Sequence, residues 1–252
     1  MHNLHNFEPA YLDMRSLFFV LLFISSILLS AQTKTFVGVK LGGGASTAFM
    51  QHSIFPLAMD IAWLPGVNGG IQVTHFPEKF KSKLNAGFQI GVNYVQKGWV
   101  QKFTDTSEPN HTTRINYLEL PMEAVGYFGN RNKYFLSVGF FFEYAISADV
   151  DAIPASAVDD PDTNFGTMLV GQSTFYRYEI NKDNRLNYGP RGSVGVFRET
   201  GRGVLRLEAF FSFSIRSVYD YEPLESGIPD LSLNYGAGAS ISYMFSFGKL
   251  EI

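Results

Sequence analysis

The stretch LSLNYGAGASISYMFSFGKLEI, Leu231 to Ile252, separates into two sets of residues when every second position is read. The set that begins with Leu231 is almost wholly apolar, and the other set is almost wholly small or polar. A period of two indicates a β-strand with one face in apolar surroundings. The stretch is much longer than the roughly 5–6 residues of a usual globular strand. It therefore predicts a long, two-faced strand at the end of the chain.

The same alternation recurs along the whole chain. Most of the alternating segments reach the roughly 9–11 residues that a tilted strand needs to cross a bilayer. We expect eight strands, at residues 35–46, 67–76, 84–100, 114–128, 134–146, 185–198, 204–217 and 231–252. Pro121 and Pro190 lie inside two of them, and we expect a local bulge at each because proline cannot donate to the ladder.

Long and short connections alternate between these strands. Tight connections lie at Gly129–Lys133 and Glu199–Gly203, whereas Ser147–Asn184 is very long and acidic. Transmembrane barrels have short turns on the periplasmic side and longer loops outside. We predict an all-β fold: a closed, eight-stranded, antiparallel up-and-down transmembrane β-barrel. Both termini then lie on the short-turn side, and the last strand pairs with strand 35–46.

The chemistry of the two faces indicates which one meets lipid. A soluble eight-stranded barrel would alternate as well, with its apolar face inside and its polar face outside. The polar face here is mainly Gly, Ser and Asn, which suits a narrow interior better than a solvated surface. We expect these aromatic residues to face lipid: Phe88, Tyr94, Phe140, Phe142, Phe211, Phe213, Tyr243, Phe245 and Phe247. We also expect Trp99, Tyr134, Tyr144, Tyr188 and Tyr235 to join the interfacial girdles.

A small set of charges falls on the inward face. Four basic and four acidic residues would balance there, as charges inside a membrane require. We predict a lumen network of Lys40, Glu119, Glu123, Glu143, Arg191, Arg206, Glu208 and Arg216. An eight-stranded barrel is only wide enough for its own side chains, which favours a packed plug over a catalytic or conducting lumen.

The N-terminus has the layout of an export signal. Met14–Ala31 carries one arginine, a short apolar run and small residues before a cleavage point. The run is too short for a spanning helix, although an uncleaved anchor remains an alternative. We expect residues 1–13 to be an upstream extension that is not native, 14–31 a signal peptide, and 32–252 the barrel.

Composition excludes several functional classes. The net charge is −3, which does not favour nucleic acid, and the absence of Cys excludes disulfides and thiolate metal sites. The histidines show no metal-ligand spacing, and the acidic residues Asp151, Asp159, Asp160 and Asp162 lack the spacing of a calcium loop. We expect no cofactor and no enzyme activity. A rim-active barrel enzyme would have only His52 and His111 to draw on.

Three short motifs resemble a known family. YLELP (residues 117–121), NYVQKG (93–98) and YMFSFGK (243–249) resemble the PorT-like outer-membrane β-barrel family of Bacteroidetes. The resemblance implies an integral outer-membrane barrel of a Gram-negative bacterium and supplies no catalytic residues. One namesake member takes part in protein secretion. We therefore expect a monomer in outer-membrane lipid, with a structural, envelope or adhesive role. An accessory role in secretion, through loops that contact envelope or secretion proteins, is the alternative.

Overall fold

The fold was determined as a computed structural model. It describes residues 34–51, 59–77, 84–103, 110–129, 133–151, 178–200, 203–220 and 231–247. Eight strands make up most of these residues, and no helix among them is long and apolar enough to cross a membrane. The strands are β1 (Lys34–Gln51), β2 (Met59–Phe76), β3 (Leu84–Phe103), β4 (His111–Phe128), β5 (Lys133–Val150), β6 (Leu186–Thr200), β7 (Gly203–Phe213) and β8 (Leu231–Phe247).

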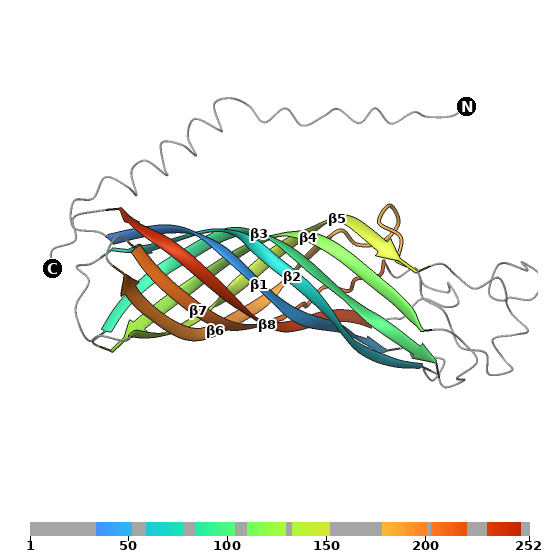
Figure 1. Cartoon of the computed structure of the whole chain (residues 1–252). Coiled ribbons are helices and arrows are strands. Elements are labelled where there is room, and N and C mark those ends of the chain that lie inside the picture. Colours follow the sequence, from blue (N-terminus) through green and yellow to red (C-terminus); the bar gives the residue numbers. More distant parts are fainter. Residues whose placement is uncertain are drawn as a thin grey trace, which may run out of the picture.

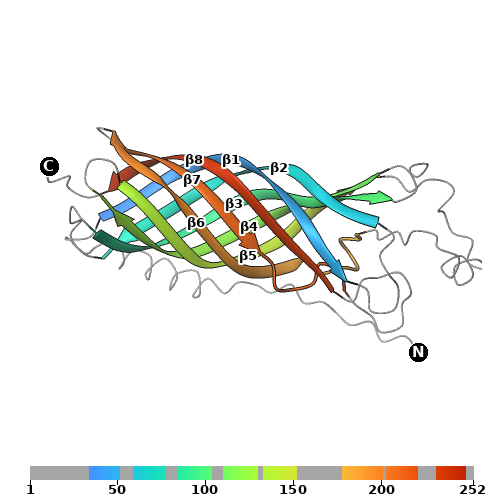
Figure 2. The same cartoon turned by 90° about the horizontal axis from the view of Figure 1, so that it is seen from below.

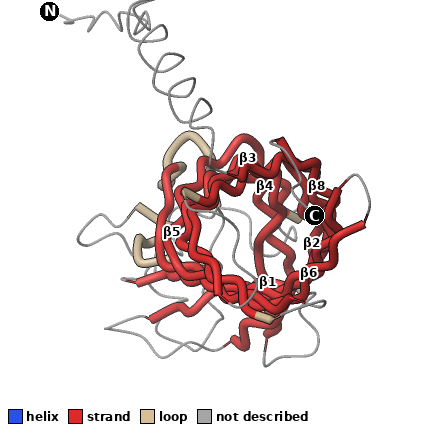
Figure 3. Tube along the Cα trace, turned by 90° about the vertical axis from the view of Figure 1, so that its left-hand side faces the viewer, coloured by secondary structure: helices blue, strands red, loops and turns tan. Residues whose placement is uncertain are grey.

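The strands form a closed antiparallel ring in sequence order (Figures 1 and 3). The ring closes between its first and last strands, which pair from Thr35 opposite Phe247 to Gln51 opposite Leu231. The predicted closed eight-stranded barrel is therefore confirmed, and so is the predicted pairing of the terminal strands. The expected upstream extension and signal peptide lie outside the described residues.

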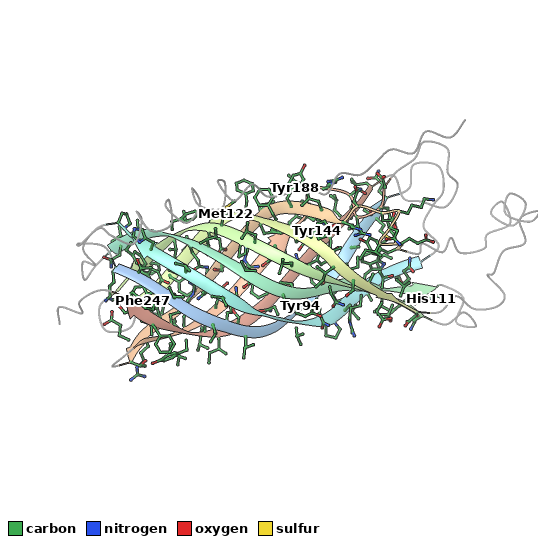
Figure 4. All side chains as sticks on the ribbon, turned by 90° about the horizontal axis from the view of Figure 1, so that it is seen from above. Tyr94, His111, Met122, Tyr144, Tyr188 and Phe247 are labelled. Carbon is green, nitrogen blue, oxygen red and sulfur yellow. The ribbon has the colours of Figure 1, made fainter. Side chains whose placement is uncertain are left out.

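The outward face is an apolar band, which has the same height on the neighbouring strands β3 and β4. On β3 the exposed apolar side chains run from Leu84 to Tyr94, and on β4 from Phe128 to Leu118. Eleven residues rise about 33 Å along a strand, and a tilt of about 40° reduces this to about 25 Å, the height of the apolar band of membrane barrels. Figure 4 shows Phe247 near one end of the barrel and Tyr94 about half-way along its length.

Polar side chains end the band on the long-loop side. The Tyr94 hydroxyl donates to Asn116 Oδ1 at 2.8 Å and accepts from Gln96 Nε2 at 3.1 Å. Asn116 Nδ2 donates in turn to Ser147 Oγ at 2.8 Å. These side chains cross β3, β4 and β5, and they place the outer membrane interface at this level.

The expected bulges at the two prolines are wrong. The β3–β4 ladder is interrupted opposite Pro121 but resumes in the same register, with the proline ring close to Gly91. Pro190 lies opposite Phe140 in an unshifted register, and the ladder to β7 begins only at Arg191. Proline has no backbone N–H. At Pro121 and Pro190 this missing donor falls where the ladder to the neighbouring strand has no bond to make.

The register shifts occur elsewhere, and one of them explains why β2 was placed too short. It lies between Trp63 and Asn68, a stretch that contains Pro65. The strand continues beyond this bulge to Met59. Ser46 of β1 bonds directly to β3 near this register shift. Its hydroxyl accepts from Gly98 N at 2.7 Å and donates to Gly98 O at 2.9 Å. A second shift lies at Asn116/Tyr117, between β4 and β5.

The outer rim has an uneven height. β1 to β5 continue well past the polar side chains that end the apolar band, whereas β6 begins at Leu186 and β7 ends at Phe213 (Figure 2). The tall part of the wall therefore comprises β1 to β5 together with β8, whose first residue Leu231 lies opposite Gln51 at the end of β1. The segments 178–185 and 214–220 lie on the low side.

Phe211 tests which face meets lipid, because it is 51% exposed within the apolar band. We predict that Phe211→Arg lowers the free energy of unfolding from lipid vesicles by about 2–4 kcal/mol, because a charge then enters hydrocarbon. Phe211→Leu is the control and should keep most of the stability. A negligible loss for the arginine variant in urea titrations would mean that the faces are reversed.

Candidate functional site

The centre of the lumen holds a network of buried charges. Seven of the eight residues expected there lie in it, all at 5% exposure or less: Lys40, Glu119, Glu123, Glu143, Arg191, Arg206 and Glu208. Arg191 is the hub, with contacts to Glu119 at 3.4 Å, Glu123 at 3.3 Å and Glu208 at 3.3 Å. Glu208 also pairs with Arg206 at 2.8 Å and with Lys40 at 3.9 Å.

Arg216 lies apart from this network, and Lys97 takes its place. β7 ends at Phe213, so Arg216 lies on the outer rim, where its Nη2 donates to Asn184 Oδ1 at 2.5 Å. Lys97 Nζ contacts Glu143 at 2.6 Å and Glu119 at 3.8 Å. The expected membership of Arg216 is corrected accordingly, and the balance of four basic and four acidic groups is kept. Lys97 has the same parity as the inward residue Gln89, a signal that was present in the sequence.

Neutral side chains complete the network. Gln89 Nε2 donates to Glu123 at 2.8 Å, and Asn93 Nδ2 donates to Glu119 at 3.2 Å. Arg206 also donates to Gln89. The guanidinium of Arg206 lies 3.8 Å from the centre of the Phe135 ring, a cation–π contact. The buried charges are therefore neutralised and hydrogen-bonded together, as a low-dielectric interior demands.

An aromatic cluster fills the lumen at the short-turn end. Phe36, Phe76, Tyr127, Phe135 and Phe197 are buried there, together with Val125, Val204 and Met244. The Tyr127 ring packs against Phe76 at 5.2 Å and against Phe197 at 4.7 Å between centroids. Inward glycines make the room, since a Cβ on Gly195 would overlap the Phe135 ring. These inward aromatics were not expected from the sequence, which placed the aromatic residues on the lipid face.

A second apolar cluster, which we call the outer plug, closes the long-loop end. It contains Trp99, Tyr117, Tyr178, Val218 and Tyr219, with Ala48, Met50, Ile115 and Ala145. The Tyr219 ring lies 6.1 Å from Trp99 and 6.4 Å from Tyr178. Trp99 is fully buried, so its expected place in the lipid girdle is wrong. It shares the odd numbering of the inward residues of β3.

Hydrogen bonds hold the rim segments over the outer plug. Asn184 Nδ2 donates to Ser217 O at 3.2 Å and Tyr219 O at 3.1 Å, and Val218 N donates to Ser232 O at 2.7 Å. Burial raises the pKa of Tyr178 to about 12, with a further contribution from Asp183. The Tyr178 phenol therefore stays protonated and donates to Asn184 O at 3.3 Å.

Asp183 ties the two rim segments together. Its carboxylate accepts from Glu179 N at 2.6 Å and from Asp220 N at 3.2 Å. Burial is the main influence on this group and raises its pKa, against the lowering effect of the two amides. The rim is thus a folded structure rather than an open mouth.

The outward aromatics lie as follows. Phe88, Tyr94, Phe140, Phe142, Phe211, Phe245 and Phe247 are exposed, and Phe213 and Tyr243 are half-buried. Tyr134, Tyr144 and Tyr188 are exposed near strand ends. Trp63 was missed because the expected second strand began beyond it. It is 50% exposed at the outer interface, where its ring meets Tyr235 at 5.5 Å.

The residues that could bind a metal or take part in catalysis are scattered. Within the described part of the chain, no three His, Asp or Glu side chains gather as metal ligands would. His111 is buried at the far end of β4, and Asp151 accepts from Thr112 N at 2.8 Å (Figure 4). His52, Asp159, Asp160 and Asp162 lie outside the described residues.

Eight antiparallel strands closed into a ring, with a lipid-facing apolar band and a filled lumen, define an integral outer-membrane β-barrel of the Gram-negative type. The chain belongs to the outer membrane protein beta-barrel domain family, whose model matches residues 30–248. No curated protein sequence matches the chain.

Several solved barrels are similar in structure. The outer membrane protein OprG of Pseudomonas aeruginosa has 9% identity and a TM-score of 0.48, covering 87% of this chain and 97% of its own. The attachment invasion locus protein Ail of Yersinia pestis has 10% identity and a TM-score of 0.38, covering 84% and 99%. Neisserial surface protein A has 11% identity and a TM-score of 0.38, covering 82% and 95%.

A double-mutant cycle tests the role of Lys97. We predict that Lys97→Met lowers the free energy of unfolding by about 3–5 kcal/mol, because Glu143 is left buried without its cation. Lys97→Met combined with Glu143→Gln should recover a large part of that loss. Arg216→Gln, outside the network, should cost less than Lys97→Met. Equal costs for Lys97→Met and Arg216→Gln in urea unfolding would contradict the assignment.

Proposed function

We propose that the protein is a non-conducting, non-enzymatic outer-membrane barrel with a structural, envelope or adhesive role exerted through its outer rim. The occlusion of the lumen carries this proposal. Three layers of side chains follow one another along the axis: the aromatic cluster, the charge network and the outer plug. Such a lumen offers no path for a solute, which leaves the rim as the surface for interaction.

Several features of the rim support such a role. Strands β1 to β5 carry regular structure beyond the membrane interface, so their ends form a stiff wall. The rim segments are tied to each other and to β8 through Asn184 and Ser232. A rigid, preformed surface loses less conformational entropy on binding than a flexible loop does.

The PorT-like resemblance supports a second candidate, an accessory role in protein secretion. Two of its motifs meet inside the barrel, where Lys97 and Asn93 contact Glu119. In this protein those motif residues build the lumen network, so they contribute to the barrel rather than to a contact surface. We therefore favour the structural or adhesive role. The remaining parts of the proposal are membership in the PorT-like group of Bacteroidetes, export by a signal peptide at 14–31, and a monomer surrounded by lipid.

Conductance measurements test the occlusion. We predict that the purified protein in planar bilayers gives no stable channel steps, and that its liposomes retain small sugars. A general porin in the same lipid is the positive control. Stable conductance of the folded, heat-modifiable form would contradict a filled lumen.

A gene deletion separates the two roles. If the structural or adhesive role is right, the deletion should change envelope permeability or surface attachment and leave the set of secreted proteins intact. Loss of secreted proteins, restored by the wild-type gene, would favour the secretion role instead.

A further inference from the structure

The outer end of β5 has a strand partner on one side only. Its ladder with β6 ends at Tyr144 opposite Leu186, followed by a bond from Ala145 N to Arg185 O at 2.8 Å. Its ladder with β4 continues to Val150. Before Arg185 the neighbouring chain forms a turn, since Asp183 N and Lys182 N both bond to Glu179 O, at 2.8 Å and 2.9 Å, and so do not continue the ladder to β5. Among the described residues, Ile146–Val150 therefore form a free edge.

Hydrogen bonding shows which groups this edge presents. Asp151 N donates to Thr112 O of β4 at 3.0 Å. In an antiparallel ladder, alternate residues direct their N–H and C=O groups to opposite sides. The backbone groups of Val150 and Ala148 therefore point away from β4, toward the free side. They are arranged as a strand template, with a donor and an acceptor on every second residue.

The side chains of the edge have two distinct faces. Ala148 and Val150 are partly buried against the outer plug. Ser147 and Asp149 lie on the opposite face, both exposed, and Asp149 forms no ion pair within the described part of the chain. A strand added here would need apolar residues beside Ala148 and Val150. On the other face, basic residues beside Asp149 would be favoured as a cross-strand pair.

We propose that Ile146–Val150 is a strand-addition site for an extended segment of another polypeptide, with alternating apolar and basic residues. The site rests on the proposed function, because it gives the outer rim a partner of defined chemistry. Main-chain hydrogen bonds to Ala148 and Val150 would supply the binding, and the alternating side chains would supply the selection.

The other gap in the rim provides a control. The β1–β2 ladder ends at Ser46 opposite Leu64, so the outer ends of these strands also separate. Asp60 is an exposed acidic residue on β2 beside this gap and matches Asp149 in charge and exposure.

The test uses the full-length protein in nanodiscs of zwitterionic lipid and a fluorescein-labelled peptide of sequence KVKVKVK. Fluorescence anisotropy should show saturable binding. A peptide of the same sequence with every amide N-methylated should bind at least about tenfold more weakly, because it cannot donate main-chain hydrogen bonds.

Ala148→Pro should weaken binding of the unmodified peptide to a similar degree, because it removes one donor from the edge without removing a bond to β4. Asp149→Lys should also weaken it at least about tenfold, and Asp60→Lys should stay within about twofold.

Each contrary result overturns the proposal. Failure of the wild-type protein to bind would mean that the edge is occupied or closed. Equal binding of the N-methylated peptide would mean side-chain adhesion without strand addition, and this comparison needs no protein variant to fold. Equal effects at Asp149 and Asp60 would mean non-specific attraction to an acidic rim. Conductance of the same preparation would overturn the filled lumen while leaving the peptide result to stand separately.

Discussion

The structure depends on one constraint: backbone groups inside lipid have no water to bond and must pair with one another. β-strands satisfy this constraint only when the sheet has no edge within the hydrocarbon. The ladder between β1 and β8 removes that edge, from Thr35 opposite Phe247 to Gln51 opposite Leu231. The two-faced last strand therefore has a definite task, which is to complete the ring begun by the first strand. Beyond the membrane, at the outer rim, the described part of β5 does leave such an edge.

Closure with eight strands then determines the interior. The ring is narrow, so a small inward residue can make room for a large neighbour, as Gly195 does beside Phe135. Charged side chains enter this space as a neutral set of Lys40, Lys97, Arg191 and Arg206 with Glu119, Glu123, Glu143 and Glu208. Aromatic clusters cover the set at both ends. Buried pairs of this kind are costly to break, and they fix one packing of the lumen.

Much of this could be predicted from the sequence because a period of two is a strong signal. Strand number follows from this period, closure from the alternation of long and short connections, and the direction of the faces from the small residues on the inward side. The inward positions of Lys97 and Trp99 could also have been predicted, since both residues have the same odd numbering as the inward residue Gln89. Parity could not locate the end of β7, which leaves the ladder after Phe213, so Arg216 was placed in the lumen. Sequence rules do not distinguish Pro65 from Pro121, yet the register shifts beside Pro65 and is kept at Pro121.

A filled lumen and a stiff, uneven rim give the barrel its functional character. The central claim is closure between the first and last strands, and an engineered disulfide tests it most directly because the chain has no cysteine of its own. Leu41 and Ile241 lie opposite each other on β1 and β8, both exposed to lipid. Leu41→Cys with Ile241→Cys should cross-link almost completely under copper phenanthroline in native membranes. The cross-linked chain cannot extend fully when it is denatured, so its mobility on a denaturing gel should differ from that of the reduced chain. Leu41→Cys with Leu136→Cys on the distant strand β5 should stay uncross-linked. Failure of the first pair, or equal cross-linking of both pairs, would contradict the closed barrel described above.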